Sequence, residues 1–307
     1  MLSLKRKLVR WVGIYFVISV VLFLVVTFPR QIYVEQLGGV MHLSDGFSMA
    51  LYYEQIIGYL SYIIENKTLG YTRSGTTIEQ SAFYLFTYSL PVVILALLLT
   101  YTFGCLKGIV DYQLQQSSWN VFGRKLTNAL ESIPDFFLII CTQYLLIRFL
   151  PFIPIFENQE WYRFILPALI VSVYPSVYFA KVTRGLLSNE EGSPYLQVAA
   201  AKGFNRTYII YKHMVRKISG SLLDQIPTIT MIVLSNLLIV EFIFSYNGAA
   251  LRMFRAMDVS AAVSAGRGNE FEPGMILALG LGFMLIVFVV QVIAEAIKSF
   301  ADPRRFE

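Results

Sequence analysis

Six stretches of this sequence are apolar over a length that would cross a lipid bilayer. A helix needs about 20 apolar residues to span the hydrocarbon core. The stretches lie at residues 9–28, 83–107, 128–150, 162–183, 222–246 and 275–298. Of the 307 residues, 56% are hydrophobic and only 15% are charged, against about 25% charged in soluble domains. We therefore expect an all-α integral membrane protein with six transmembrane helices.

The amino-terminal stretch has a basic head followed by a long apolar run. The run is longer than the core of a signal peptide, and no small-residue cleavage site follows it. We therefore expect it to be retained as the first span. The expected division of the chain lies at residue 82: residues 1–82 hold the first span and a long extracytoplasmic loop, and residues 83–307 hold a five-helix core.

The distribution of lysine and arginine predicts which loops face the cytoplasm. With the amino terminus inside, the cytoplasmic side carries 17 of the 25 basic residues and the outer side carries 8. Cytoplasmic loops of membrane proteins carry such an excess. We expect both termini and the loop 184–221 to lie in the cytoplasm, in a multi-pass protein of the plasma membrane. The same excess accounts for the net charge of +5, so no nucleic-acid partner is expected.

Three prolines, Pro91, Pro175 and Pro227, fall inside predicted spans. Each removes a backbone hydrogen bond and can kink its helix. Such kinks either serve a gating movement or only shape the packing of the spans.

The sequence lacks the residue patterns of a metal site or a catalytic site. Cys105 and Cys141 lie in apolar runs, where cysteine is usually a small packing residue. His42 and His213 are far apart in the sequence, and no Gly-x-Ser-x-Gly motif is present. We expect no metal ligand and no catalytic residue, which disfavours a membrane-embedded enzyme.

Residues 193–217, which we call the hinge segment, form a polar-leaning stretch between two predicted spans. Serine is favoured at the N-cap and proline at the first helical position, so a helix should begin at Ser193 and Pro194. Gly203 suits the left-handed position that ends a helix, and Asn205 can cap the next one. The segment therefore predicts two short helices joined by a tight turn at Gly203.

The second of these helices should have two different faces. Tyr208, Tyr211 and Val215 share one side at helical spacing. Basic residues share roughly the opposite side, namely Arg206, His213 and Lys217. The hinge segment then suits docking of a cytoplasmic protein partner, with a helix lying near lipid phosphates as the alternative. A DNA-binding helix-turn-helix is disfavoured because membrane spans fix both ends.

The hinge segment resembles the coupling loop, or EAA loop, of permease subunits of ABC importers. The oligopeptide, dipeptide and nickel permease group of the first-permease type is the most similar. Its loop commonly reads "TR…YV.TARAKG" before a basic helix with Arg-His. The matching stretches here are Thr183-Arg184, residues 195–203 and Lys212-His213. Residues 240–248 resemble that group's "vE.vFs.pG", and residues 302–305 resemble its "DPR" tail. Gln197 stands where a glutamate or a basic residue is usual, which marks a divergent member.

This resemblance implies a type I ABC importer permease fold with cytoplasmic coupling helices. ATPase-coupling residues would be Tyr195, Gln197, Ala199, Ala200, Lys202, Gly203, Arg206 and His213. The chain itself would bind no cofactor, in keeping with a sequence that has no P-loop Gly-Lys. ATP and Mg²⁺ would bind two separate ATPase subunits.

The same resemblance implies further partners in a bacterial or archaeal membrane. A second permease, surrounded like this chain by membrane lipid, would pair with it. The peptide group favours a homologue and so a heterodimer, with an identical copy as the alternative. An extracellular substrate-binding protein would dock on the loops 29–82 and 247–274. The alternative for these loops is that they only cap the pore.

The expected substrates are peptides, with nickel or another small solute as the alternative. Polar residues within or near spans are costly in lipid and tend to face the interior of the helix bundle. The candidates for the substrate path are Gln143, Tyr144, Ser235, Asn236 and Glu241. For Asn236 the alternative is an interhelical hydrogen bond, and for Glu241 it is a structural contact with the outer loop.

Two other classes of function compete with import driven by ATP. An ion-driven secondary transporter often has acidic residues near the membrane midplane, whereas the acidic residues here lie toward the ends of the spans. The other class is a structural or sensory membrane protein without transport. Only the resemblance of the hinge segment to a coupling loop argues against it.

Overall fold

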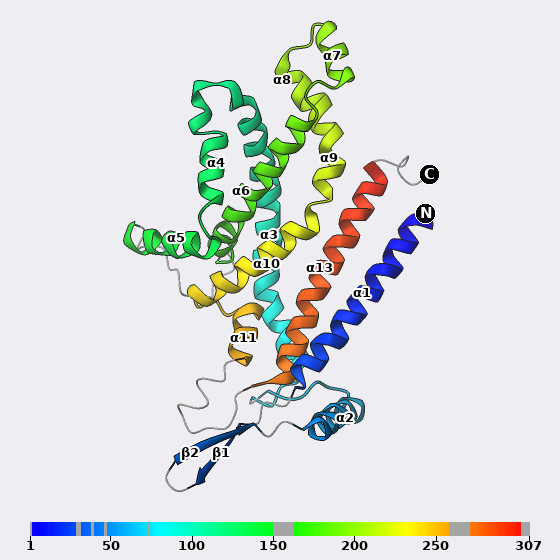
Figure 1. The fold of residues 1–307 in the computed structure, drawn as a ribbon, viewed down its shortest axis with the longest axis vertical. Helices are drawn as coiled ribbons and strands as arrows, with labels where there is room; N and C mark the ends of the chain where they lie inside the picture. The colour runs from blue at the N-terminus through cyan, green and yellow to red at the C-terminus, as the bar shows by residue number, and fades with distance from the viewer. Residues whose placement is uncertain are drawn as a thin grey trace. The chain divides into compact units, whose positions relative to one another are not determined.

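The computed structural model describes residues 2–28, 32–37, 40–45, 48–72, 74–149, 163–257 and 271–301, and most of these residues are helical (Figure 1). The α-helices are α1 (Leu2–Val26), α2 (Met49–Asn66), α3 (Ile78–Gln113), α4 (Arg124–Glu131), α5 (Asp135–Phe149), α6 (Ile165–Asn189), α7 (Pro194–Ala201), α8 (Arg206–Ile209), α9 (Val215–Leu223), α10 (Ile226–Ile243), α11 (Ala249–Ala256) and α13 (Pro273–Ala301). Short turns of 3₁₀-helix cover Leu114–Gln116 and Ser118–Val121. The expected loop 151–161, much of 247–274 and the tail 302–305 lie outside the described residues.

Within the part of the chain that the structure describes, five helices are long and apolar enough to cross a membrane. These are α1 from Arg6 onward, α3, α6, α10 and α13. A sixth crossing is present if the bent helix pair Trp119–Glu131 and Asp135–Phe149 counts as one span. The prediction of an all-α, multi-pass membrane protein is thereby confirmed.

The third predicted span, 128–150, is a bent pair rather than one straight helix. The two parts meet at an angle of 108°, with Pro134 just before α5. Residues before a proline are disfavoured in the helical conformation, which explains the break at this point. α5 has 15 residues and is about 22 Å long, which is short of a hydrocarbon core about 30 Å thick.

A β-hairpin in the outer loop was not expected from the sequence. The strands β1 (Ile32–Leu37) and β2 (Val40–Asp45) pair antiparallel, with Leu37 opposite Val40. The hairpin connects α1 to α2, so the loop 29–82 contains a hairpin and a helix of 18 residues.

Two of the three prolines lie inside helices, as predicted. Pro91 is within α3 and Pro175 within α6. The prediction for Pro227 is wrong, because α10 begins at Ile226 and places this proline in its first turn. A backbone N–H is unpaired in the first turn of any helix, so proline costs no hydrogen bond there.

The chain forms two compact units. Unit 1 contains residues 1–5, 87–251 and 286–307, and unit 2 contains residues 6–86 and 252–285. The helices α3 and α13 each contribute residues to both units. The division of the chain expected at residue 82, between the first span with its outer loop and a five-helix core, stays a prediction.

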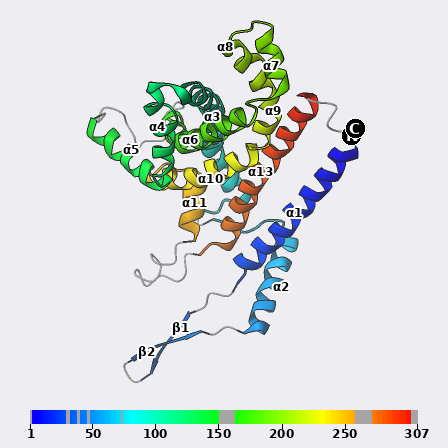
Figure 2. The ribbon, with the colours of Figure 1, turned by 45° about the horizontal axis from the view of Figure 1, so that its top comes forward.

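In unit 1, α10 packs against α5 and α6, and α4 packs against α6. The buried side chains between these helices are mainly aliphatic and aromatic, for example Phe179, Ile229 and Leu237. Glycine lets α3 and α6 approach closely, since a Cβ at Gly108 would lie 2.6 Å from the Ala180 carbonyl oxygen. Figure 2 shows α3, α4, α6 and α10 side by side from a second angle.

Candidate functional site

The hinge segment forms two helices joined by a turn, as the sequence predicts (Figure 1). Gly203 has a φ of +81°, the left-handed conformation, and the Phe204 N–H donates to the Ala199 carbonyl oxygen at 3.3 Å. Asn205 caps the second helix, because its Oδ1 accepts a hydrogen bond from the Tyr208 N–H at 3.0 Å. The predicted helix start at Pro194 is confirmed, but the Ser193 side chain makes no capping hydrogen bond.

The second helix of the hinge segment contains a wide turn that the sequence did not predict. α8 has four residues and is followed by a π-helical turn over Ile210–Met214, which leads directly into α9. A π-turn holds one extra residue, so side chains five positions apart come to the same face. Tyr208 and His213 are such a pair, with ring centroids 6.0 Å apart. The prediction that they lie on opposite sides is therefore wrong.

Three rings, Phe204, Tyr208 and His213, gather beside this turn, and we call them the aromatic patch. The rings of Phe204 and Tyr208 stack at 4.8 Å, and those of Phe204 and His213 are 6.2 Å apart. Lys212 Nζ lies 5.0 Å from the centre of the Tyr208 ring, within range of a cation–π contact. Phe204 and Tyr208 are both exposed, so the patch presents aromatic surface away from the unit.

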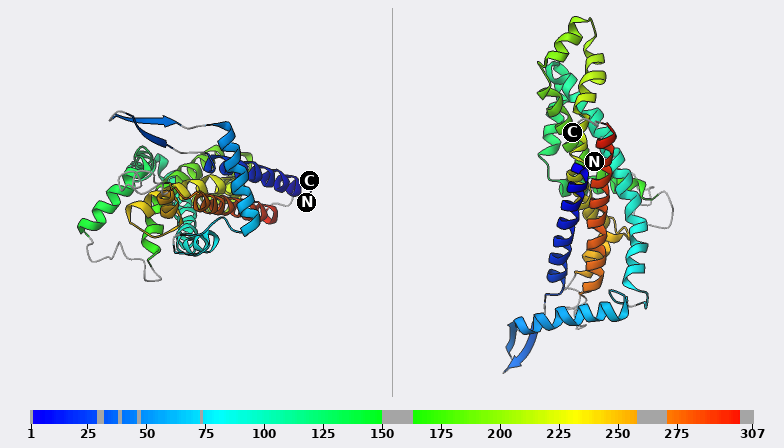
Figure 3. Two further views of the ribbon diagram at one scale, coloured as in Figure 1. Left: turned by 90° about the horizontal axis from the view of Figure 1, so that it is seen from below. Right: turned by 90° about the vertical axis from the view of Figure 1, so that its right-hand side faces the viewer.

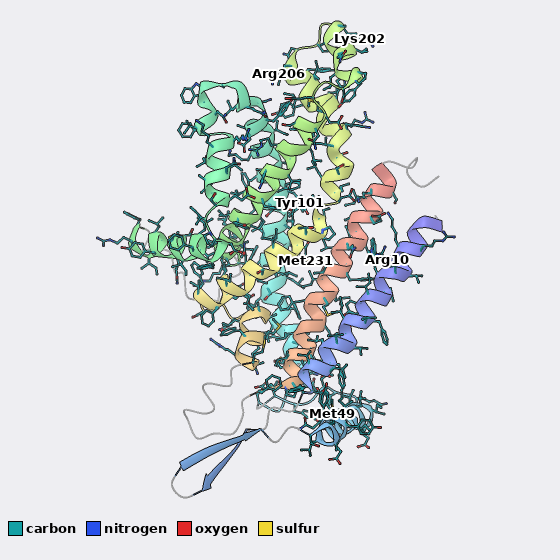
Figure 4. All side chains as sticks on the ribbon, viewed as in Figure 1. Arg10, Met49, Tyr101, Lys202, Arg206 and Met231 are labelled. Atoms are coloured by element: carbon teal, nitrogen blue, oxygen red, sulfur yellow. The ribbon has the colours of Figure 1, made fainter. Side chains whose placement is uncertain are left out.

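The hinge segment has an exposed tip and a buried base. All residues from 201 to 208 are exposed, and Figure 4 shows Lys202 and Arg206 at this end of unit 1. Buried side chains hold the base, namely Ile210, Met214, Ile218 and Leu222. They lie on the helix that packs against α6 through α9. The tip is thus available to a partner, while the base is fixed to the membrane-spanning part.

Polar contacts join the start of the hinge segment to the end of α6. The Tyr195 hydroxyl donates to Glu190 Oε2 at 2.8 Å. Burial, followed by the hydrogen bond and charge of Glu190, raises the pKa of Tyr195, so Tyr195 stays a protonated donor. At the end of α3, Tyr112 lies beside Glu191 and Arg206. These contacts tie the two helices of the hinge segment to their own unit.

The eight predicted coupling residues divide by exposure. Five are exposed at or near the tip, namely Gln197, Ala200, Lys202, Gly203 and Arg206. Tyr195 and His213 are half-buried, and Ala199 is buried. Val198 and Phe204, which the sequence analysis did not select, are also exposed. For Phe204 the available signal was a large apolar residue next to a turn glycine.

The predicted substrate-path residues do not form one cluster. Gln143 Nε2 donates to the Ile243 carbonyl oxygen at 3.1 Å, which joins α5 to α10. Tyr144 and Ser235 are exposed, whereas Asn236 is fully buried. Among the described residues, neither polar atom of the Asn236 side chain has a hydrogen-bond partner.

Glu241 has a structural contact of the kind considered as its alternative role. The residue is fully buried. Its Oε1 accepts from the Ser89 hydroxyl at 2.5 Å, and its Oε2 accepts from the Leu251 N–H at 2.8 Å. The carboxylate therefore links α3 and α10 to the first turn of α11, the position in a helix that favours negative charge.

One face of α10 is exposed along much of its length. Met231, Ser235 and Phe242 are exposed and lie four and seven residues apart, on one side of the helix. Figure 4 labels Met231 on this helix. Of the substrate-path candidates on α10, Ser235 lies on this exposed face, while Asn236 and Glu241 point into unit 1.

The structure offers no evident metal centre in the residues it describes. No group of three or more His, Cys, Asp or Glu side chains in that part of the chain could hold an ion.

The hinge segment lies inside the part of the chain that matches a known protein family. Residues 80–301 match the model of a family described as "Binding-protein-dependent transport system inner membrane component". A permease protein of Brucella suis, provisionally named for peptide transport, is 24% identical over 224 residues, which cover 70% of this chain and 68% of the relative. A protein of Brucella abortus is similar to the same extent. The glutathione transport system permease protein of Salmonella typhimurium is 26% identical over 155 residues, 48% of this chain and 46% of that protein.

Proposed function

Because the chain belongs to the family of binding-protein-dependent transport system inner membrane components, we propose that it moves peptides into the cell as one membrane subunit of an ATP-driven importer. Members of the family are transport permeases rather than enzymes. The names of the Brucella and Salmonella relatives, which refer to peptide and glutathione transport, support a peptide-type substrate.

The observation that carries this proposal is the exposed tip of the hinge segment on its buried base. The tip, with the aromatic patch, inserts into a groove on an ATPase subunit. Exposed aromatic side chains are frequent anchors at protein interfaces. The buried base passes any movement of the ATPase on to α6 and α10.

Import then depends on a shift between two conformations of the permease. ATP binding closes two ATPase subunits around the nucleotide, and this closure favours one conformation over the other. ATP and Mg²⁺ are held by those partner subunits and not by this chain. Both termini and the hinge segment face the cytoplasm, in agreement with the excess of basic residues there.

The substrate path lies between this chain and a second, homologous permease. The exposed face of α10, with Met231, Ser235 and Phe242, is the surface we assign to that contact. An extracellular substrate-binding protein delivers the substrate to the outer face, where the loops 29–82 and 247–274 lie.

The test is reconstitution of the permease with the ATPase subunits, second permease and binding protein from neighbouring genes. Proteoliposomes loaded with ATP should take up labelled di- and oligopeptides, and uptake should stop without ATP or without the ATPase subunits. Uptake of glutathione and of Ni²⁺ should be measured in the same way, to determine which class of substrate is transported. Uptake that persists without the ATPase, driven by a proton or sodium gradient, would contradict the proposal.

A further inference from the structure

The outer loop contains a helix with one side exposed along its whole length. α2 is capped at both ends: the Ala50 N–H donates to Ser48 Oγ at 3.3 Å, and Lys67 ends the helix in the left-handed conformation. None of its residues is buried within the chain. An 18-residue helix gains most of its stability from burial of an apolar face, so something outside this chain should cover α2.

One side of α2 forms a continuous apolar stripe, which we call the outer stripe. Its members lie three or four positions apart, on one face of the helix: Met49, Tyr53, Ile57, Leu60 and Ile64. They are strongly exposed, with values of 74% for Met49 and Ile64 and 65% for Tyr53. Polar side chains run along the adjacent face, namely Glu54, Ser61 and Glu65. α2 is thus amphipathic, with its apolar side uncovered.

The side of α2 that flanks the outer stripe, about 100° round the helix from it, is fixed to the end of a membrane span in unit 2. The Tyr52 hydroxyl donates to the Leu24 carbonyl oxygen at 2.7 Å, in the last turn of α1. The rings of Tyr59 and Phe23 stack with centroids 5.9 Å apart. Figure 3 shows α2 running across the end of α1 rather than along it. α2 therefore lies at the level where α1 leaves the hydrocarbon core.

The apolar surface of α1 continues onto α2. α1 is an apolar span with few buried residues and with most of its side chains exposed, so lipid or a neighbouring subunit covers much of it. At its end, Phe28 is also exposed and meets the Tyr52 ring edge-on at 5.5 Å. α2 contributes four tyrosines, a residue type enriched at membrane–water interfaces. A helix with this position and composition suits the interface of a bilayer.

We propose that α2 lies in the outer membrane–water interface, with the outer stripe among the acyl chains and Glu54, Ser61 and Glu65 toward water. α2 contains no lysine or arginine, so apolar burial rather than attraction to anionic lipid holds it there. The stripe is then covered by lipid and does not belong to the surface that receives the binding protein. The proposal rests on the membrane location of the chain and is independent of the substrate.

The test measures the depth of spin labels on the full-length protein in phosphatidylcholine vesicles. Single cysteines replace Ile57 or Ile64 of the outer stripe, or Ser61 or Glu65 of the polar face, in a Cys105→Ala, Cys141→Ala background. Labels at 57 and 64 should collide preferentially with O₂, at a depth of about 5–10 Å below the headgroups. Labels at 61 and 65 should collide preferentially with a water-soluble nickel chelate. Adding phosphatidylglycerol should not change these depths.

Two results would overturn the proposal. One is equal access of the nickel chelate to labels on the stripe and on the polar face. The other is a stripe that is reached by the chelate in vesicles and becomes protected only when the binding protein is added, which would assign the stripe to a protein partner. Leu60→Cys provides a second stripe position if the label at Ile57 disturbs folding.

Discussion

Asp224, in the short break between α9 and α10, forms an ion pair with Lys298 on α13. Lys298 Nζ also lies 3.7 Å from Glu295 Oε2, one turn earlier on the same helix. Because α9 continues the hinge segment, this pair joins the base of the segment to the last span within unit 1. The Asp224 side chain is half exposed, so water screens part of the attraction.

We predict that Asp224→Asn and Lys298→Met each weaken the link between ATP hydrolysis and transport. In a double-mutant cycle the double variant should be no worse than Lys298→Met alone, because that change already removes the pair with Asp224. The coupling energy should be at most about 1 kcal/mol, as for partly exposed ion pairs. The link is measured as the amount of substrate taken up per ATP hydrolysed in proteoliposomes. Strictly additive effects of the two changes would argue against a functional pair.

Gly203→Val should uncouple ATP hydrolysis from transport while leaving membrane insertion intact. A Cβ at this position would meet no atom within 4 Å, so the cost is the left-handed backbone itself, about 1–2 kcal/mol for a residue other than glycine. Gly203→Asn is the matched control, because asparagine adopts this conformation more readily. Full transport by the valine variant would count heavily against transmission through the hinge segment.

Removal of the aromatic patch should weaken binding of the ATPase subunit. Alanine at Phe204 or Tyr208 should cost about 2 kcal/mol, or roughly thirtyfold in affinity, if these rings are interface anchors. Phe83→Ala removes a ring at the start of α3 that is even more exposed and should have no such effect. Co-purification with the ATPase subunit, or titration in nanodiscs, gives the affinity. Equal losses in all three variants would point to general destabilisation instead.

The Glu241 carboxylate should contribute strongly to the stability of unit 1. In Glu241→Ala, the Ser89 hydroxyl and the Leu251 N–H lose their shared acceptor, at about 1–3 kcal/mol for each buried group left unpaired. A Cβ at Gly248 would overlap this carboxylate, so Gly248→Ala should also destabilise the protein. The double variant should lose less stability than the two single losses combined, because removal of the carboxylate makes room for the methyl group. Thermal unfolding in detergent checks this, and fully additive losses would contradict it.

The sequence predicted those helices and turns that are determined by the residues within them. Hydrophobic length gave α1, α3, α6, α10 and α13, and turn chemistry gave Gly203 and the Asn205 cap. Membership of the importer family followed from the pattern around the hinge segment, which lies inside the matched residues 80–301.

Features that depend on register or on distant partners could not be predicted in this way. The π-turn at Ile210–Met214 has no sequence marker, yet it moves His213 onto the face of Tyr208. Residues 128–150 were expected to form one span, and neither the break beside Pro134 nor the 108° bend there was predicted. The partners of Glu241 come from positions 10 and 152 residues away, which spacing along one helix cannot indicate.

The most direct test of the account is the location of the hinge-segment tip in intact cells. A single cysteine replaces Thr207, an exposed residue between Arg206 and Tyr208, in a background without Cys105 and Cys141. We predict that a membrane-impermeant maleimide added outside leaves it unlabelled, and that a bifunctional reagent added to inside-out vesicles cross-links it to the ATPase subunit. Labelling of this cysteine from the cell exterior would contradict the account.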